Sequence, residues 1–183
     1  MSADSEQTPS SREVSAVLLV TVFIIALCGI FYELLISSIS TYFLGSGVLH
    51  FSLTIGLFMS FMGVGSYLSR YITEPLLDRF ITFEIWLGGV GGCSALILYF
   101  SYSLTENYYL VAFLLIAFLG CLIGLEIPLL TRLVQPNADL KDALANALSF
   151  DYLGALFASV LFPLILLPYL GIMKTSFVIG ILN

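Results

Sequence analysis

The chain has 183 residues, of which 60% are hydrophobic and 10% are charged, and its mean hydropathy is +1.07. Soluble domains carry about 25% charged residues, so this composition excludes a soluble protein and indicates a membrane protein. The net charge of −6 comes from a polar acidic tail and from acids in or beside apolar segments, and the six basic residues form no patch. We therefore expect no nucleic-acid partner.

Residues 1–13 are rich in Ser, Thr and acids and lack the basic start of a signal peptide, so we expect a disordered polar tail. The remainder, 14–183, is predicted to be one transmembrane helical domain. A helix needs about 20 apolar residues to cross a bilayer. Runs of that kind occupy 14–35 (with an extension to 44), 51–71, 81–102, 110–133 and 143–167.

Short polar or Gly- and Pro-containing segments separate these runs, among them Gly45-Ser46-Gly47 and Thr73-Glu74-Pro75. After Gly171 the remaining apolar residues are too few for a crossing, so we expect the chain to stop partway through a sixth span. The predicted fold is an all-α polytopic bundle of about five full spans and a truncated sixth.

Basic residues predict the orientation of this bundle. One side of the predicted membrane has only Lys174, and the other has Arg12, Arg70, Arg79, Arg132 and Lys141. Because cytoplasmic loops are enriched in Lys and Arg, we expect a cytoplasmic N-terminus in a bacterial inner membrane. Tyr99, Tyr102, Tyr108 and Tyr109 should then form an aromatic belt at the outer surface.

Single cysteines and a single histidine argue against metal or haem sites. We interpret Cys28, Cys93 and Cys121 as buried small residues, because no Cys-x-x-Cys pair or neighbouring histidine accompanies them. His50 is predicted to be an interfacial residue, and a pH-sensing or ligand role is the weaker alternative. We assign no cofactor, no metal ligand and no catalytic residue.

Glu126 is the most informative residue, because it lies with Pro128 inside an otherwise apolar run. A charge at the centre of a membrane helix costs about 2.5 kcal/mol or more, so such an acid is expected to face protein or water. Pro128 removes a backbone donor, which is tolerable where neighbouring helices or water compensate. Both residues therefore predict surrounding helices.

Helical periodicity places small residues beside three other acids, Glu33, Glu84 and Asp151, so these should point towards neighbouring helices. Glu126 lies away from its small face, Gly120 and Gly124, and should meet a different neighbour. In 51–71 the predicted packing stripe is Ser52, Gly56, Ser60, Gly63, Ser66 and Arg70. The glycine run 88–92 follows no strand, so we interpret it as close packing or a kink.

The predicted buried polar set is Glu33, Arg70, Glu84, Glu126, Arg132 and Asp151. Glu33 should lie near the outer face, and the others in the inner half, where Arg70 is the first candidate for their cation and Arg132 the second. Structural ion pairs are the favoured interpretation. The alternative is that these groups line a path for a proton, a cation or a polyamine.

Several motifs together resemble the N-terminal membrane domain of bacterial membrane-bound spermidine synthases. They are Phe31-Tyr-Glu-Leu-Leu35, Phe51-Ser-Leu-Thr-Ile-Gly-Leu57, Met62-Gly-Val-Gly-Ser-Tyr-Leu-Ser-Arg70, Gly124-Leu-Glu-Ile-Pro-Leu-Leu-Thr-Arg132 and Asp151-Tyr-Leu-Gly-Ala155. The resemblance implies a multi-span domain followed by a soluble aminopropyltransferase, which transfers an aminopropyl group from decarboxylated S-adenosylmethionine to putrescine. We expect the catalytic residues of that second domain to lie outside this sequence.

Three functions are compatible with these features. The first is a membrane anchor, or a channel or sensor for polyamine-like cations. The second is an accessory structural subunit of a larger membrane complex, and the third is half of a cation or polyamine transporter. The expected partners are the lipid bilayer, other membrane subunits or a second copy of the chain, and a polyamine ligand.

Overall fold

The computed structural model describes residues 11–104, 107–134 and 140–183, with side chains from residue 17 onward except those of Val134 and Leu140. All secondary structure in these ranges is helical, as predicted. The elements are α1 (Ser11–Leu44), α2 (Gly47–Leu68), a 3-10 turn (Ser69–Tyr71), α3 (Leu76–Gly92), α4 (Ser94–Leu104), α5 (Tyr108–Val134), α6 (Leu140–Leu161), a π-helical segment (Phe162–Leu170) and α7 (Gly171–Leu182). Residues 1–10 of the predicted polar tail lie outside the described residues.

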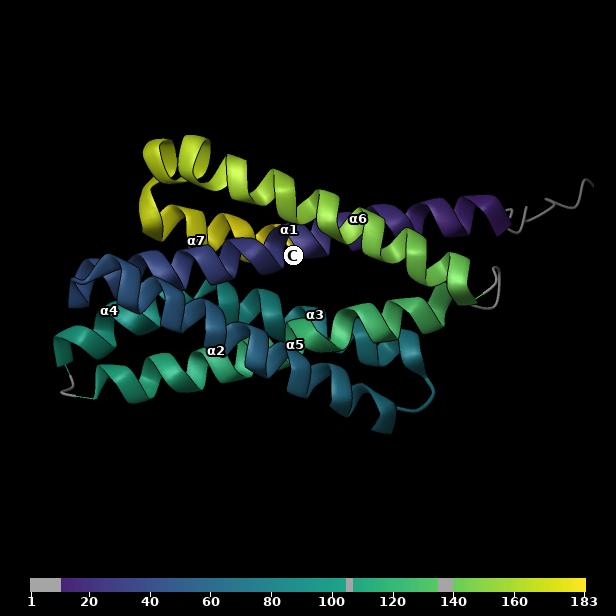
Figure 1. Ribbon diagram of the computed structural model, residues 1–183, viewed down its shortest axis with the longest axis horizontal. Helices are drawn as coiled ribbons and strands as arrows, with labels where there is room; N and C mark the ends of the chain where they lie inside the picture. Colours follow the sequence, from purple (N-terminus) through teal and green to yellow (C-terminus); the bar gives the residue numbers. More distant parts are fainter. Residues whose placement is uncertain (1–10, 105–106, 135–139) are drawn as a thin grey trace, which may run out of the picture.

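The helices run roughly parallel to the long axis of the molecule (Figure 1). Helix α1 is central and contacts α2, α5, α6 and α7, while α2 packs along α5 and α3 packs on α7 and α5. Side chains of α1 and α5 make up most of the core, and Tyr32, Leu35, Ile36 and Ile39 of α1 are fully buried. The core is therefore built mainly from the first and fourth apolar runs of the sequence.

Four segments are long and apolar enough to cross a membrane, Val17–Leu44, Gly47–Tyr71, Tyr108–Leu133 and Lys141–Leu182. The pair α3 and α4 would add a fifth, but it is bent by 43° at Cys93. Membrane crossing and the number of spans stay predictions. The predicted extension of the first run to Leu44 is confirmed, because α1 is continuous to that residue.

The helix of the fifth predicted span does not end at its prolines. Pro163 and Pro168 remove backbone donors, and the chain from Phe162 to Leu170 widens into a π helix instead of ending. Gly171, with φ of 70°, then reverses the direction of the chain. Helix α7 folds back beside α1 and α3, and the last residue lies near mid-length of the bundle (Figure 1).

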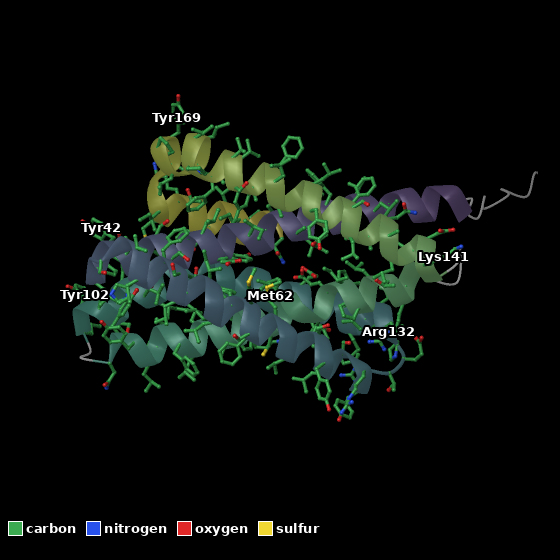
Figure 2. The ribbon with its side chains drawn as sticks, in the orientation of Figure 1. Tyr42, Met62, Tyr102, Arg132, Lys141 and Tyr169 are labelled. Carbon is green, nitrogen blue, oxygen red and sulfur yellow. The ribbon has the colours of Figure 1, made fainter. Side chains whose placement is uncertain are left out.

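The two ends of the bundle differ in chemistry. Arg132 and Lys141 lie at one end, and Tyr42, Tyr102 and Tyr169 lie at the other (Figure 2). At the tyrosine end the ring of Phe43 stacks on Tyr102 with centroids 4.2 Å apart and meets the edges of Tyr99 and Tyr108. The predicted grouping of these tyrosines is confirmed, although its position relative to a membrane is still a prediction.

Glycines allow α2 and α5 to touch backbone to backbone. A Cβ atom on Gly65 would lie 2.0 Å from the carbonyl oxygen of Cys121, and one on Gly124 would lie 2.1 Å from that of Met62. Close approach of this kind is the packing that small residues permit between membrane helices. The predicted packing role of Gly124 is therefore confirmed.

The predicted packing stripe on α2 is wrong within this chain. Its members, from Ser52 to Arg70, are exposed, and a Cβ atom on Gly56 or Gly63 would meet nothing within 4 Å. Helix α2 lies at the edge of the bundle and turns Thr54, Phe58 and Gly65 inward instead. The helical period identified a face of mostly small residues on α2, but α5 packs against a different face of that helix.

The glycine run 88–92 both packs closely and breaks the helix, as predicted. Gly91 accommodates the ring of Tyr32, and Gly88 and Gly92 face Gly180 of α7. Helix α3 ends there, because four glycines within five residues weaken helical structure. Cys93 at the break is exposed, so its interpretation as a buried residue is wrong, whereas Cys28 is buried and Cys121 is half-buried.

Candidate functional site

Glu126 lines a small cavity of about 60 Å³ near the middle of the bundle. Its side chain is 5% exposed, and its Oε1 atom has no hydrogen-bond partner. The fold directs Glu126 here because Gly120 and Gly124, on a different side of α5, are held against α2. We predicted that Glu126 contacts helices other than the one that packs on the glycines of α5. This prediction is confirmed, because residues of α1 and α6 line the cavity beside Glu126.

Two further carboxylates line the same cavity, Glu33 from α1 and Asp151 from α6. Small residues bring these helices together, since Gly154 packs against the carbonyl oxygen of Phe23, and Ala26, Gly29 and Ala155 line the cavity. Glu33 is 9% exposed, and Asp151 is half-buried. The predicted orientation of both acids along small-residue faces is therefore confirmed.

The predicted separation of Glu33 from the other acids by depth is wrong. Because α1 continues to Leu44, Glu33 lies about 16 Å before the end of its helix, at a rise of 1.5 Å per residue, rather than at the outer surface. That longer helix brings Glu33 to the level of Glu126 and Asp151. The error arose because the predicted depth took the span to end at Leu35, without its extension to Leu44.

Glu84 lies elsewhere, in a larger groove between α1, α3 and α7 of about 610 Å³. Its Oε2 atom accepts a hydrogen bond of 2.8 Å from Nδ2 of Asn183, which also donates to the backbone carbonyl of Glu84 at 3.2 Å. Glu84 thus has a neutral amide partner. It is still close enough to Glu126 for electrostatic interaction between the two carboxylates.

Neither predicted cation lies in the cavity. Arg70 is exposed, and its Nη2 atom donates to the hydroxyl groups of Tyr67 and Tyr71, with its guanidinium carbon 3.8 Å from the Tyr67 ring centroid. It cannot reach the carboxylates because it follows the exposed face of α2. In place of the expected ion pairing with inner acids, Arg70 stacks on tyrosines of its own segment.

Arg132 is used to close the end of the bundle. Its guanidinium donates to the carbonyl oxygens of Ser69 at 2.5 Å and Ile72 at 3.0 Å, and its Nε donates to that of Pro128 at 3.3 Å. These bonds fix the end of α5 to the chain that leaves α2. Unpaired carbonyls at the end of a helix explain why an arginine is favoured there.

The cavity therefore contains carboxylates without a basic residue among the described side chains that line it. Three negative charges in an apolar bundle repel one another and lose their hydration, so protons or a bound cation must neutralise them. The described residues include no group of three or more His, Cys, Asp and Glu side chains that could hold a metal ion. Acid–base chemistry or binding of a larger cation is what this arrangement permits.

Sequence reasoning missed two residues of these sites. Met62 lines the cavity from α2, and Figure 2 places it near the middle of the bundle. Asn183 pairs with Glu84 across the bundle. Met62 lies in one of the motifs that carry the family resemblance, but an apolar side chain gives no separate signal, and Asn183 has none before the fold is known.

Comparison with known proteins gives the relatives of the chain. It is 45% identical over 166 residues to a polyamine aminopropyltransferase of Leptospira interrogans. This alignment covers 91% of this chain and 33% of the relative. Polyamine aminopropyltransferases 1 and 2 of Ralstonia nicotianae are 40% and 41% identical, covering 98% and 92% of this chain and 35% and 34% of those proteins. No family model and no solved structure matches the chain.

These alignments cover most of the chain, including all four acids, and confirm the predicted resemblance to spermidine synthases. The chain spans about a third of the length of the relatives it matches. Over the residues that it matches, the chain is therefore homologous to a part of the polyamine aminopropyltransferases.

Proposed function

We propose that this chain forms a membrane-spanning domain that anchors a polyamine aminopropyltransferase to the bacterial inner membrane. The N-terminus, Arg70, Arg79, Arg132 and Lys141 would face the cytoplasm. The relatives are named for transfer of aminopropyl groups to polyamines, and that activity would belong to a part of the protein outside the third that this chain spans.

The observation that carries this proposal is the polarity of the bundle along its axis. Arg132 and Lys141 are at one end and an aromatic cluster is at the other, with long apolar helices between them. Cytoplasmic loops favour Lys and Arg, while Tyr is enriched where a membrane meets water. Large apolar side chains are also exposed along the helices, for example Ile85, Trp86 and Leu156, which suits a surface covered by lipid.

Site-specific labelling tests this orientation. In a chain with its three cysteines replaced, Ser46→Cys and Thr73→Cys place a thiol at exposed positions between α1 and α2 and between α2 and α3. A membrane-impermeant maleimide added to intact cells should label position 46 and should label position 73 only after permeabilisation. Extraction of the chain by alkaline carbonate, or labelling of both positions in intact cells, would contradict the proposal.

A second candidate function, half of a cation transporter, is favoured by the cavity lined by Glu33, Glu126 and Asp151. Transport requires a site for the cation inside the bundle, and transporter sites lie near the middle of the membrane. Uptake of labelled putrescine into vesicles that depends on Glu126 is the direct test. The accessory-subunit alternative stays a prediction, to be tested by purification with other membrane subunits.

A further inference from the structure

We infer that the cavity lined by Glu33, Glu126 and Asp151 is a binding site for the ammonium group of an alkylamine. The inference goes beyond the proposed anchoring role and does not depend on it. It follows from the charge of the cavity, the unsatisfied hydrogen-bonding capacity of its lining, its size and the shape of the groove beside it.

The strongest argument is the Oε1 atom of Glu126. This atom is buried and accepts no hydrogen bond, and Glu126 is one of the residues that line the cavity. A buried polar atom without a partner costs about 1–3 kcal/mol. The side chain as a whole is 95% shielded, so bulk solvent cannot satisfy it. A ligand with N–H donors would satisfy this oxygen, and a positive charge would also offset the repulsion from Glu84 and Asp151.

Size and geometry select the kind of cation. A volume of about 60 Å³ admits a small head group with a few water molecules, since one water needs roughly 10–15 Å³ of this measure. The described acids do not form a group close enough to hold a metal ion directly. An ammonium group suits such spacing, because its N–H donors reach carboxylates directly or through water.

An apolar groove of about 590 Å³ adjoins the cavity and explains where the rest of an alkylamine would lie. Met62, Ile123 and Ile127 line both spaces, and the groove continues past Thr131 to Arg132 at the basic end of the bundle. A flexible methionine between the two spaces can move aside more readily than a branched side chain. The methylene groups would occupy the groove and the ammonium group the cavity.

Binding to the purified full chain in detergent tests the inference, with methylammonium and butylammonium as probes and isothermal titration as the measurement. We expect one site per chain, tighter binding of butylammonium than of methylammonium, and no binding of tetramethylammonium, which is charged but has no N–H donor. Glu126→Gln should weaken butylammonium binding by roughly tenfold or more, because it removes a charged acceptor.

The matched control is Glu84→Gln, which changes an acid outside the cavity that still interacts electrostatically with Glu126, so it should weaken binding clearly less than Glu126→Gln does. Ala155→Leu fills the cavity while keeping all three carboxylates, and should abolish binding. The unfolding temperature without ligand shows whether Glu126→Gln folds. If it does not, Ala155→Leu tests whether butylammonium binds in the cavity.

Absence of butylammonium binding to the unchanged chain overturns the inference, as does equal weakening by Glu84→Gln or unaltered affinity in Ala155→Leu. Equal affinity for methylammonium and butylammonium overturns the placement of the alkyl chain in the groove. Loss of binding with correct cysteine labelling at positions 46 and 73 would leave the anchoring proposal intact, so the two can fail separately.

Discussion

Glu84 and Glu126 are both glutamates within apolar helices, but their surroundings differ. Glu84 is held by the amide of Asn183, beside a seam in which Gly88 and Gly92 of α3 meet Gly180 of α7. Glu126 shares a cavity with two other acids. An Oε1 atom without a partner is common to both residues, so they differ in the hydrogen bond that Oε2 of Glu84 accepts from Asn183. Each is close to a glycine-mediated helix contact, so packing alone does not distinguish them.

The difference lies in what satisfies the carboxylate. A buried acid with a hydrogen-bond partner in the same fold can serve to fix the position of a helix. An acid that lacks such a partner adds nothing to stability and indicates a ligand or a proton. We therefore assign a structural role to Glu84 and a binding role to Glu126.

The largest effect is expected at the backbone contact that positions Glu126. Gly124→Ala would place Cβ 2.1 Å from the carbonyl oxygen of Met62, so α2 and α5 must separate, at a cost of about 2–4 kcal/mol in free energy of unfolding. Gly88→Ala should cost less, because its nearest obstacle, the carbonyl oxygen of Gly180, lies 2.8 Å away. Denaturation in detergent measures both.

The control for this pair is Gly63→Ala on α2, where the new Cβ would meet nothing within 4 Å. It should be neutral or stabilising by up to about 1 kcal/mol, because alanine favours a helix. Equal destabilisation by Gly63→Ala and Gly124→Ala would show that the exposed stripe of α2 packs against something after all.

A smaller effect is expected where α7 holds the Glu84 region. The Oγ atom of Ser176 lies 2.7 Å from the carbonyl oxygen of Gly92 and 3.2 Å from that of Gly91, at the break between α3 and α4. Ser176→Ala would leave these buried carbonyls without that donor and should cost about 1–2 kcal/mol in unfolding free energy. Ser60→Ala, an exposed serine bonded within α2, is the control and should change nothing measurable.

The smallest effects, of opposite sign, test the comparison itself. Glu84→Leu leaves Asn183 without its carboxylate partner and should destabilise the chain by about 1 kcal/mol. Glu126→Leu removes a buried group with an unpaired oxygen and should be neutral or stabilising by about 1 kcal/mol. The same denaturation assay, without amine, compares them.

If Glu126→Leu instead destabilised the chain more than Glu84→Leu, Glu126 would have a structural partner, and the distinction between the two glutamates would be lost. Asn183→Ala provides a check on the other side. It should cost at least as much as Glu84→Leu, because it removes the bond to the carboxylate and also the bond to the backbone carbonyl of Glu84.

Much of the helical architecture was predictable from the order of residues. Apolar runs predicted α1, α2, α5 and α6, because a chain in an apolar environment must satisfy its backbone within each helix. Breaks at Gly45, at the glycine run 88–92 and at Gly171 followed from the conformational freedom of glycine. The inward faces of Asp151 and Glu84 followed from the helical period, since small residues share those faces.

Only the tertiary structure decided which acids meet. The period of a helix fixes which residues share a face, but the neighbour of that face depends on helix length, tilt and edge position, which are properties of the packed bundle. Glu33 joined Glu126 and Asp151 because α1 is longer than its most apolar part, and Arg70 stayed outside because α2 lies at the edge. The cavity thus arises from contacts among four helices that no single segment encodes.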